Sequence, residues 1–400
     1  MKLKRESDVL VVGAGPVGLF TALSLAERGL SVQIIDKEWR GSTHSYALAL
    51  HPQTLRLLDE YGAANDLLQE GHRIDRIAIY EGRERVATLD FAALGGAFPF
   101  VLVIPQSALE RALVEKLKEK KVDVFWNHQA LGLEQVGEEV RARVGLMEKY
   151  SAGYPVAHTE WAIAKEFEVR STFLVGADGC HSFARRSVGG VFEEHGTAET
   201  FLVFEFPAHI DFLHEARMVF HDGTTNVAWP LGEERGRWGF QVDRDSSTPP
   251  KLTSLRELIS ARAPWFQPQV EKIHWSTTVL FEKRLVDHFG RRRIWLAGDA
   301  AHMTGPVGAQ SMNIGLQEAH DLAERFSAIH KGGGSLEMLE SYQNERKAVW
   351  ERLLGIEASL EATSAAPDWI GKHPARILPC IPASGDDLQQ LLKQIGLRLA

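Results

Sequence analysis

The sequence predicts an α/β protein with a Rossmann-like parallel core, an inserted mixed or antiparallel β-sheet domain, and C-terminal helices. Three observations predict this fold class. Residues 7–12 are apolar and β-branched, as in a buried strand, and they end at a glycine-rich turn followed by a helix at 19–28. From about 190 to 284 the chain alternates and is rich in aromatic residues, which is typical of strands. Helical spacing returns from Asn313 onward.

The elements follow in order along the chain. Leucine spacing predicts helices at 52–61 and 106–120, and amphipathic spacing predicts covering helices at 336–361 and 385–399. Predicted strands lie at 31–35, within 76–104, and at 122–126, 172–175, 201–206, 217–220, 227–230, 237–242 and 293–297. Three nucleotide-binding segments are expected (1–75, 106–189 and 285–330), with a β insertion (76–105), a substrate-binding sheet domain (190–284) and covering helices (331–400).

The first motif is the turn Gly13-Ala14-Gly15-Pro16-Val17-Gly18. Gly13 permits the turn, Gly15 lets the backbone approach a pyrophosphate, and Gly18 lets the helix pack on the strand. The second strand ends at Asp36, where a carboxylate would accept hydrogen bonds from ribose hydroxyls and disfavour a 2′-phosphate. A glycine-rich turn in an ordinary βαβ unit is the alternative. A membrane span over 9–26 is disfavoured because the glycines and the proline interrupt it.

Two further motifs each carry an aspartate after a strand. They are Gly176-Ala177-Asp178-Gly179 and Gly298-Asp299-Ala300-Ala301-His302. Ligands bind open α/β sheets at the carboxyl ends of the strands, and small alanines would let a planar group come close. The three motifs, in this order, indicate bound FAD. The alternatives are a helix N-cap for Asp299, a solvent turn for Asp178 and a solvated or capping role for His181.

The composition excludes several classes of protein. A net charge of −8 over 400 residues gives no reason to expect nucleic acid as a partner. Only two cysteines occur, Cys180 and Cys380, so neither a disulfide framework nor a metal-ligand pattern is expected. This cysteine usage favours the cytoplasm, and Cys180 is expected to be a packed thiol.

The chain resembles the class A flavoprotein monooxygenases, the group that contains para-hydroxybenzoate hydroxylase. Residues 178–185 fit the family pattern Asp-Gly-x-x-Ser-x-x-Arg, and the third motif continues to Pro306 and to Met312-Asn313-x-Gly315. The resemblance implies non-covalent FAD, with NADPH or NADH and O2 as co-substrates. It also implies an aromatic small-molecule substrate, which the aromatic-rich segment 190–284 would suit; the alternative is that these rings are only the core of the second sheet. No integral membrane segment is expected, and a homodimer stays open.

The resemblance also implies roles for single residues. Asp299 would bond the ribityl chain, and Pro306 would lie beside the isoalloxazine ring. The expected cofactor site comprises Gly13, Gly15, Pro16, Gly18, Asp36, Lys37, Arg40, His44, Gln106, Asp178, Gly179, Gly298, Asp299, Pro306, Gly308, Ser311, Met312 and Asn313. The residues expected nearest the reaction are Pro306, Gly308 and His181.

The sequence departs from the family pattern in two places. Ala309 and Ser311 stand where glycine is customary, so the loop is expected slightly farther from the ring. The loop after Asp36 lacks the customary arginine, which leaves Arg40 or His44 to approach the pyrophosphate.

The implied reaction is hydroxylation of an electron-rich substrate through a C4a-hydroperoxyflavin. A halogenase is disfavoured because the segment Gly-x-x-Trp-x-Trp-x-Ile-Pro is absent from the sequence. A flavin reductase or oxidase and a non-catalytic flavin-binding protein stay open. Without a thioredoxin-like C-terminal domain, the expected size is that of the shorter single-component hydroxylases. Substrate identity, the choice of nicotinamide and oligomeric state are not encoded in any motif.

Overall fold

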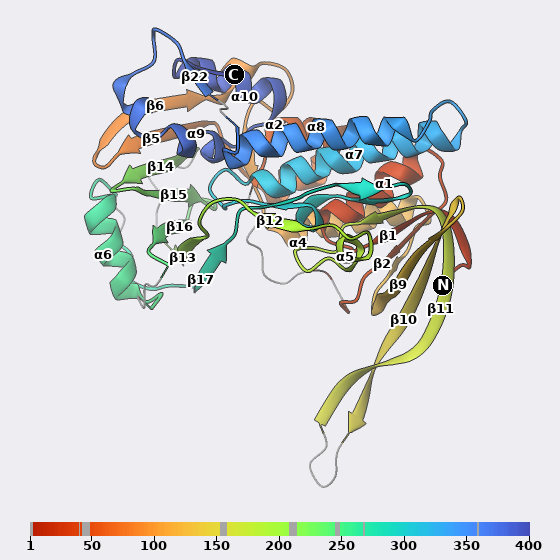
Figure 1. Ribbon diagram of the computed structural model, residues 1–400. Coiled ribbons are helices and arrows are strands. Elements are labelled where there is room, and N and C mark those ends of the chain that lie inside the picture. The colour runs from red at the N-terminus through yellow and green to blue at the C-terminus, as the bar shows by residue number, and fades with distance from the viewer. Residues whose placement is uncertain are drawn as a thin grey trace.

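The computed structural model describes residues 3–39, 41, 49–152, 158–207, 214–244, 249–266, 269–357 and 360–400. Figure 1 shows helices α1, α7 and α8 stacked on the parallel core, with a second sheet on the other side of the molecule. This arrangement confirms the predicted fold class. Within the described residues, no helix is both long and apolar enough to cross a membrane.

The central sheet brings the three motif-bearing strands together. Its order is β19-β20-β11-β1-β2-β8, and β1 pairs in parallel with both β2 and β11, while β20 pairs in parallel with β11. The bounds are β1 Glu6–Val12, β2 Val32–Ile35, β8 Val124–Phe125, β11 His158–Gly176, β19 Gly290–Arg291 and β20 Ile294–Leu296. Because β1, β11 and β20 are parallel neighbours, the motifs that follow them share one edge of the sheet.

A long hairpin was not predicted. β9 (His128–Val136) and β10 (Glu139–Ala152) precede β11, and the β10–β11 ribbon extends away from the body in Figure 1. The sequence did contain a pattern that indicates β10, because Val140, Ala142 and Val144, which are buried, alternate with Arg141 and Arg143.

The second sheet has the order β17-β13-β16-β15-β14-β5-β6. Its strands are β5 Arg76–Glu81, β6 Glu84–Asp90, β13 Glu199–Pro207, β14 Glu215–His221, β15 Thr224–Pro230, β16 Arg235–Val242 and β17 Trp275–Phe281. The insertion predicted at 76–105 thus gives its first two strands to this sheet, through the parallel pair β5–β14. Phe204, Trp238 and Phe240 are fully buried in a core cluster that includes residues of α6 (Leu252–Arg262), so these rings pack the sheet.

Shorter elements connect the two sheets. The helices are α1 Pro16–Glu27, α2 Pro52–Glu60, α3 Ala64–Glu70, η1 Phe91–Leu94, α4 Gln106–Glu119, α5 Phe183–Ser187 and η2 Gly298–Ala300. The strands are β3 Ala49–Leu50, β4 His72–Ile74, β7 Val101–Val103, β12 Phe192–Glu194, β18 Arg284–Val286 and β21 His302–Met303. β7 pairs with both β3 and β4, and β18 pairs with both β12 and β21.

The two C-terminal helices are shorter than predicted. The elements are α7 Gln310–His330, α8 Glu337–Leu354, β22 Leu360–Ala362, η3 Asp368–Lys372, α9 Pro374–Cys380, α10 Gly385–Gln394 and β23 Leu397–Leu399. Gly355 (φ +71°) ends α8, and Gly396 (φ +73°) follows α10, after which β23 pairs with β22. The predictions of helix to 361 and to 399 were wrong because glycine in the left-handed region terminates a helix.

Candidate cofactor site

The first and second motifs are in direct backbone contact. A Cβ added to Gly13 would lie 2.1 Å from the carbonyl oxygen of Ala177, so only glycine allows this approach. The Ala177 amide donates to the carbonyl of Val12 at 2.8 Å. The turn after β1 therefore lies against the turn after β11.

The first and third motifs meet at Val17. A Cβ added to Gly298 would lie 2.9 Å from Val17 Cγ2, and one added to Gly315 would lie 2.7 Å from the same methyl. Helix α7 therefore packs directly on α1 beside the Gly298–Asp299 turn.

Arg185 joins the second motif to the third. Its guanidinium donates from Nη1 to the Ala300 carbonyl at 2.8 Å and from Nη2 to the Cys180 carbonyl at 2.7 Å. Its Cζ also lies 3.9 Å from the centre of the Phe192 ring. Arg185 is the last residue of the Asp-Gly-x-x-Ser-x-x-Arg pattern, but the pattern alone did not predict this linking role.

The amino end of α1 has room for an anion. Gly15 precedes the helix and provides no side-chain cap, and a Cβ added to it would meet nothing within 4 Å. At Gly18, by contrast, an added Cβ would lie 1.9 Å from the Gly13 carbonyl oxygen. Gly18 thus serves packing, whereas Gly15 borders open space beside unpaired helix amides, where a pyrophosphate fits.

Asp36 lies next to this turn. Its Oδ2 accepts from the Ala14 amide at 2.5 Å and its Oδ1 from the Glu38 amide at 2.8 Å. Each oxygen keeps a further lone pair for a ribose hydroxyl. Lys37 is exposed, while Arg40 and His44 fall outside the described residues.

Asp178 acts as a cap for α5. Its carboxylate accepts from Ser182 Oγ at 2.5 Å and from the amides of Phe183 at 2.6 Å and Ala184 at 3.1 Å. The side chain therefore orients the turn that contains Gly179. His181 is exposed, and its carbonyl accepts from Arg186.

Asp299 has a free carboxylate. It is exposed, it caps no helix, and it makes no hydrogen bond with any residue that the structure describes. Desolvation by the neighbouring protein nevertheless raises the pKa of Asp299; the charge of His302 lowers it and that of Glu318 raises it. A carboxylate with open hydrogen-bonding capacity at the end of β20 fits a polyhydroxyl chain.

A buried network lies beneath the Asp299 turn. Glu318, fully buried on α7, accepts from the Gly298 amide at 3.0 Å, from His302 Nε2 at 2.7 Å and from Trp350 Nε1 at 2.9 Å. The rings of His302 and Trp350 stack with centres 3.7 Å apart. No sequence pattern predicted Glu318 or Trp350.

The loop before α7 is fixed from behind by the C-terminal segment. A Cβ on Gly308 would lie 2.2 Å from the Pro379 carbonyl oxygen, and Gln310 Nε2 donates to the Ile381 carbonyl at 2.5 Å. Ala309 has φ +52°, a left-handed conformation that favours glycine. Pro306, Ser311 and Met312 are half-buried at this end of α7, where the first amides lack helical partners.

Asn313 is occupied by the fold. Its Nδ2 donates to the carbonyls of Ala49 and Ala309 at 2.9 and 2.7 Å, and its Oδ1 accepts from the His51 amide at 2.8 Å. His51 Nε2 in turn donates to the Gly308 carbonyl at 2.9 Å. Burial lowers the pKa of His51 to about 4, so the ring is neutral at pH 7. His51 was not foreseen from the sequence.

Two remaining features are Gln106 and a surface hollow on the second sheet. Gln106 begins α4 and donates from Nε2 to Glu110 at 2.7 Å.

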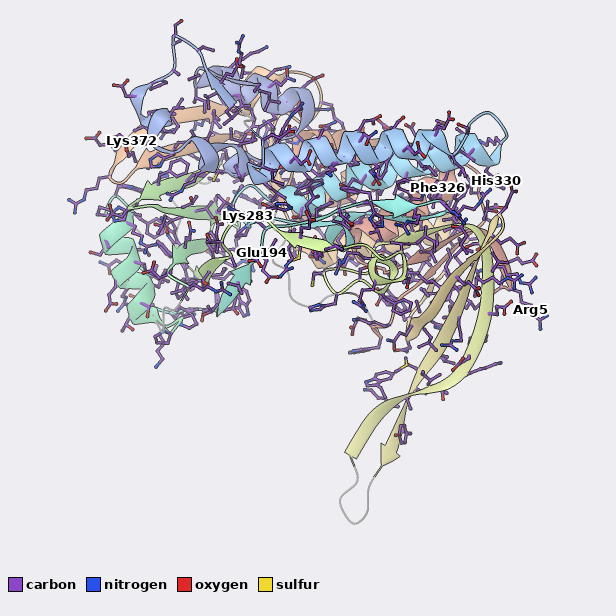
Figure 2. All side chains as sticks on the ribbon, in the orientation of Figure 1. Arg5, Glu194, Lys283, Phe326, His330 and Lys372 are labelled. Carbon is purple, nitrogen blue, oxygen red and sulfur yellow. The ribbon has the colours of Figure 1, made fainter. Side chains whose placement is uncertain are left out.

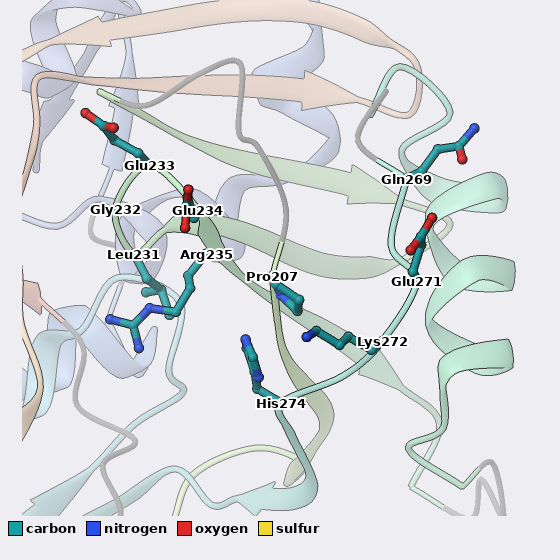
Figure 3. Close-up of a pocket in the computed structure, with 10 residues that line it drawn as sticks. All are labelled: Pro207, Leu231, Gly232, Glu233, Glu234, Arg235, Gln269, Glu271, Lys272 and His274. Carbon is teal, nitrogen blue, oxygen red and sulfur yellow. The ribbon is translucent and has the colours of Figure 1, made fainter.

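The hollow on the second sheet measures about 950 Å³ (Figure 3). None of its lining residues belongs to the three motifs: they are Pro207, Leu231, Gly232, Glu233, Glu234, Arg235, Gln269, Glu271, Lys272 and His274. Among the residues that the structure describes, no group of three or more metal-ligating side chains is present.

Comparisons with known proteins agree with this geometry. The chain is 28% identical to 6-methylpretetramide 4-monooxygenase of Streptomyces rimosus, over 90% of this chain and 62% of that protein. It is 27% identical to para-nitrophenol 4-monooxygenase of Pseudomonas sp. strain WBC-3, over 86% and 83% respectively. It thus spans less than two thirds of the first of these relatives.

Solved structures show the same fold. A p-nitrophenol 4-monooxygenase from Pseudomonas putida DLL-E4 superposes with a TM-score of 0.73 at 24% identity, covering 98% of this chain and 99% of that one. The model of the FAD binding domain family matches residues 6–356. The chain therefore belongs to the FAD-binding domain family.

Proposed function

We propose that the protein is an FAD-dependent monooxygenase that uses NADH or NADPH and dioxygen to hydroxylate an aromatic or other electron-rich small molecule. One observation carries the proposal: three motifs in mutual contact meet at the carboxyl ends of β1, β11 and β20, and the third of them presents a free carboxylate, Asp299. When bound, FAD supplies hydride acceptance and the activation of dioxygen.

The residues of the chain would bind and orient the cofactor. The α1 amides beside Gly15 would hold the pyrophosphate, Asp36 the ribose and Asp299 the ribityl hydroxyls. The first amides of α7, near Ser311 and Met312, would stabilise negative charge at the edge of the ring system. The second sheet, with its aromatic core, would position the substrate and exclude water.

The names of the relatives support an aromatic substrate, since they include monooxygenases of para-nitrophenol and of 6-methylpretetramide. We place the protein in the cytoplasm, because a reducing compartment suits two free cysteines.

Oxygen-18 labelling tests the proposal. Purified protein should be yellow, release FAD on denaturation, and incorporate one atom of labelled dioxygen into a product from a panel of phenols and aromatic acids. If every active compound yields only hydrogen peroxide, the protein is an oxidase or reductase. A colourless protein that binds no added FAD would refute the cofactor assignment.

A further inference from the structure

A lysine–glutamate pair lies beside the loop that contains Pro306. Glu199 begins β13 and Lys283 follows β17, its partner strand, and Lys283 Nζ is 2.8 Å from Glu199 Oε1. Neither residue belongs to a sequence motif. Figure 2 labels Lys283 in the central region of the molecule.

The other carboxylate oxygen of Glu199 points to the loop. A Cβ added to Gly305 would lie 3.1 Å from Glu199 Oε2, and Gly305 directly precedes Pro306. The C-terminal segment meets the same place, since Pro379 contacts Gly308. Burial raises the pKa of the adjacent Cys380 thiol, and the charges of Glu199 and Lys283 shift it further in opposite directions. The pair therefore lies where the second sheet, the loop and the C-terminal segment converge.

The pair is shielded but can be reached. The side chains of Lys283 and Glu199 are 23% and 24% exposed. Lys372 and Glu81 form a pair with the same 2.8 Å separation, but their side chains are 60% and 30% exposed. A hydrogen bond between partly buried groups is stronger than one in water, because the local dielectric constant is lower. A polar group that stays unpaired in such a place loses the free energy of its hydration.

We propose that Glu199 and Lys283 recognise the hydroxyl group of a phenolic substrate. Glu199 Oε2 would accept the hydrogen bond from the phenol O–H, while Lys283 would donate to the phenol oxygen and match its partial negative charge. A phenol thus satisfies both members of the pair, whereas its O-methyl ether has no proton for Glu199. This inference rests on the proposed function, since it places the substrate beside the Pro306 loop.

Matched ligand pairs test the proposal. The flavin absorbance of FAD-loaded protein would be titrated with 4-nitrophenol, 4-hydroxybenzoate and 3-hydroxybenzoate, and with the O-methyl ether of each. The parent should bind at least one phenol tenfold or more tightly than its ether. Glu199→Gln and Lys283→Met should reduce this preference to less than threefold while retaining FAD. Lys372→Met, in the exposed pair that Figure 2 shows apart from Lys283, should keep it.

The outcomes separate this inference from the function itself. If the parent hydroxylates a phenol but binds it no better than its ether, the pair is only a structural contact and the proposed function survives. The same conclusion follows if Glu199→Gln and Lys283→Met keep the preference. If the FAD-loaded parent binds none of the six compounds and hydroxylates no aromatic in the labelling experiment, the proposed function fails and this inference fails with it.

Discussion

At the scale of single residues, the ionised carboxylate of Asp299 should strengthen FAD binding and, when no FAD is bound, lower the stability of the folded protein. Desolvation by the surrounding protein raises its pKa, so its contribution to stability is full below the ordinary aspartate value and is lost as the pH rises through the raised value. Asp299→Asn should therefore raise the melting temperature of FAD-free protein at pH 7. It should also weaken FAD binding about tenfold, or ~1.4 kcal/mol.

Calorimetry and fluorescence titration would measure these two effects. Asp368→Asn, at an exposed carboxylate on η3, is the control and should change neither. Unchanged FAD affinity in a folded Asp299→Asn protein would remove Asp299 from the site.

Ala309 offers a second prediction for a single residue. Its left-handed backbone (φ +52°) costs an L-residue roughly 1 kcal/mol or more, and glycine is free of this cost. Ala309→Gly should therefore raise the free energy of unfolding in denaturant by about 1 kcal/mol. Ala348→Gly, in the interior of α8, should lower it by a similar amount, about 1 kcal/mol. Equal losses in both variants would contradict the left-handed assignment.

Single residues also show which parts of the site could be predicted from the sequence and which could not. Gly13, Gly18 and Gly298 were identifiable because segments that approach this closely leave no room for a Cβ, so these positions must be glycine. Glu318 and His51 were not, since a buried polar side chain looks like any other until its distant partners are known. Asp178 was placed in the cofactor site by its motif, but its side-chain hydrogen bonds go to α5.

At the scale of elements, the turn from β1 into α1 separates binding from folding. Gly15→Ala should leave the free energy of unfolding nearly unchanged, because no atom lies within 4 Å of the new methyl. It should nevertheless weaken FAD binding tenfold or more, since the methyl enters the space assigned to the pyrophosphate. Gly18→Ala should instead lower the free energy of unfolding by at least about 2 kcal/mol, because its methyl meets the Gly13 carbonyl. Denaturant unfolding without FAD and FAD titration together distinguish the two, and a Gly15→Ala protein with parental FAD affinity would contradict the pyrophosphate assignment.

The packing of α7 on the Asp299 turn should depend on Glu318 and on pH. Burial alone raises the pKa of Glu318, but His302 and the hydrogen bonds from Gly298 and Trp350 outweigh it and lower the pKa overall. The stabilisation is thus complete above the ordinary glutamate value and is lost as the pH falls through the lower folded-state value. Glu318→Ala should cost about 3–5 kcal/mol at neutral pH.

Unfolding curves from neutral to strongly acidic pH would check this prediction. The difference between the parent and Glu318→Ala should shrink at the acidic end. Glu361→Ala, which removes an exposed carboxylate paired with Arg398, should show a small difference throughout. A difference for Glu318→Ala that grows toward acid would contradict the lowered pKa.

Most elements with a clear period were predicted near their observed positions, whereas the pairing of strands that lie far apart in the chain was not predicted. The strands before each motif and the helices at 52–61 and 106–120 were found at or near their predicted positions. β5 and β6 were not expected to join β14, because these strands lie far apart in the chain. The hairpin of β9 and β10 was missed although its two strands are adjacent in the chain and residues 140–144 alternate in burial. Residues 397–399 were predicted as helix and instead pair with β22.

At the scale of the whole molecule, the second sheet and the C-terminal segment converge on the loop from Gly305 to Gly308, through Glu199 and Pro379. A loop held by His51 from one side and by Pro379 and Gln310 from another connects the cofactor-binding motifs to the second sheet. We therefore expect that a substrate bound on the second sheet would influence the cofactor site through these contacts.

Substrate should accordingly control the consumption of reduced nicotinamide. Without a substrate, an oxygenase oxidises NADH or NADPH and reduces dioxygen only to hydrogen peroxide. Slow oxidation of the nicotinamide until an aromatic ligand is bound therefore avoids this unproductive reaction. A true substrate should raise the rate of NAD(P)H oxidation tenfold or more. Each tenfold increase requires the substrate to lower the activation free energy of flavin reduction by only about 1.4 kcal/mol. Absorbance at the nicotinamide band, measured together with peroxide and hydroxylated product, follows the effect. A ligand that is not hydroxylated can also raise consumption, but peroxide must then account for all of it. Rapid oxidation that no aromatic compound alters, with peroxide as the sole product, would mean that the contacts of the second sheet and the C-terminal segment with this loop serve stability and not the control of the reaction.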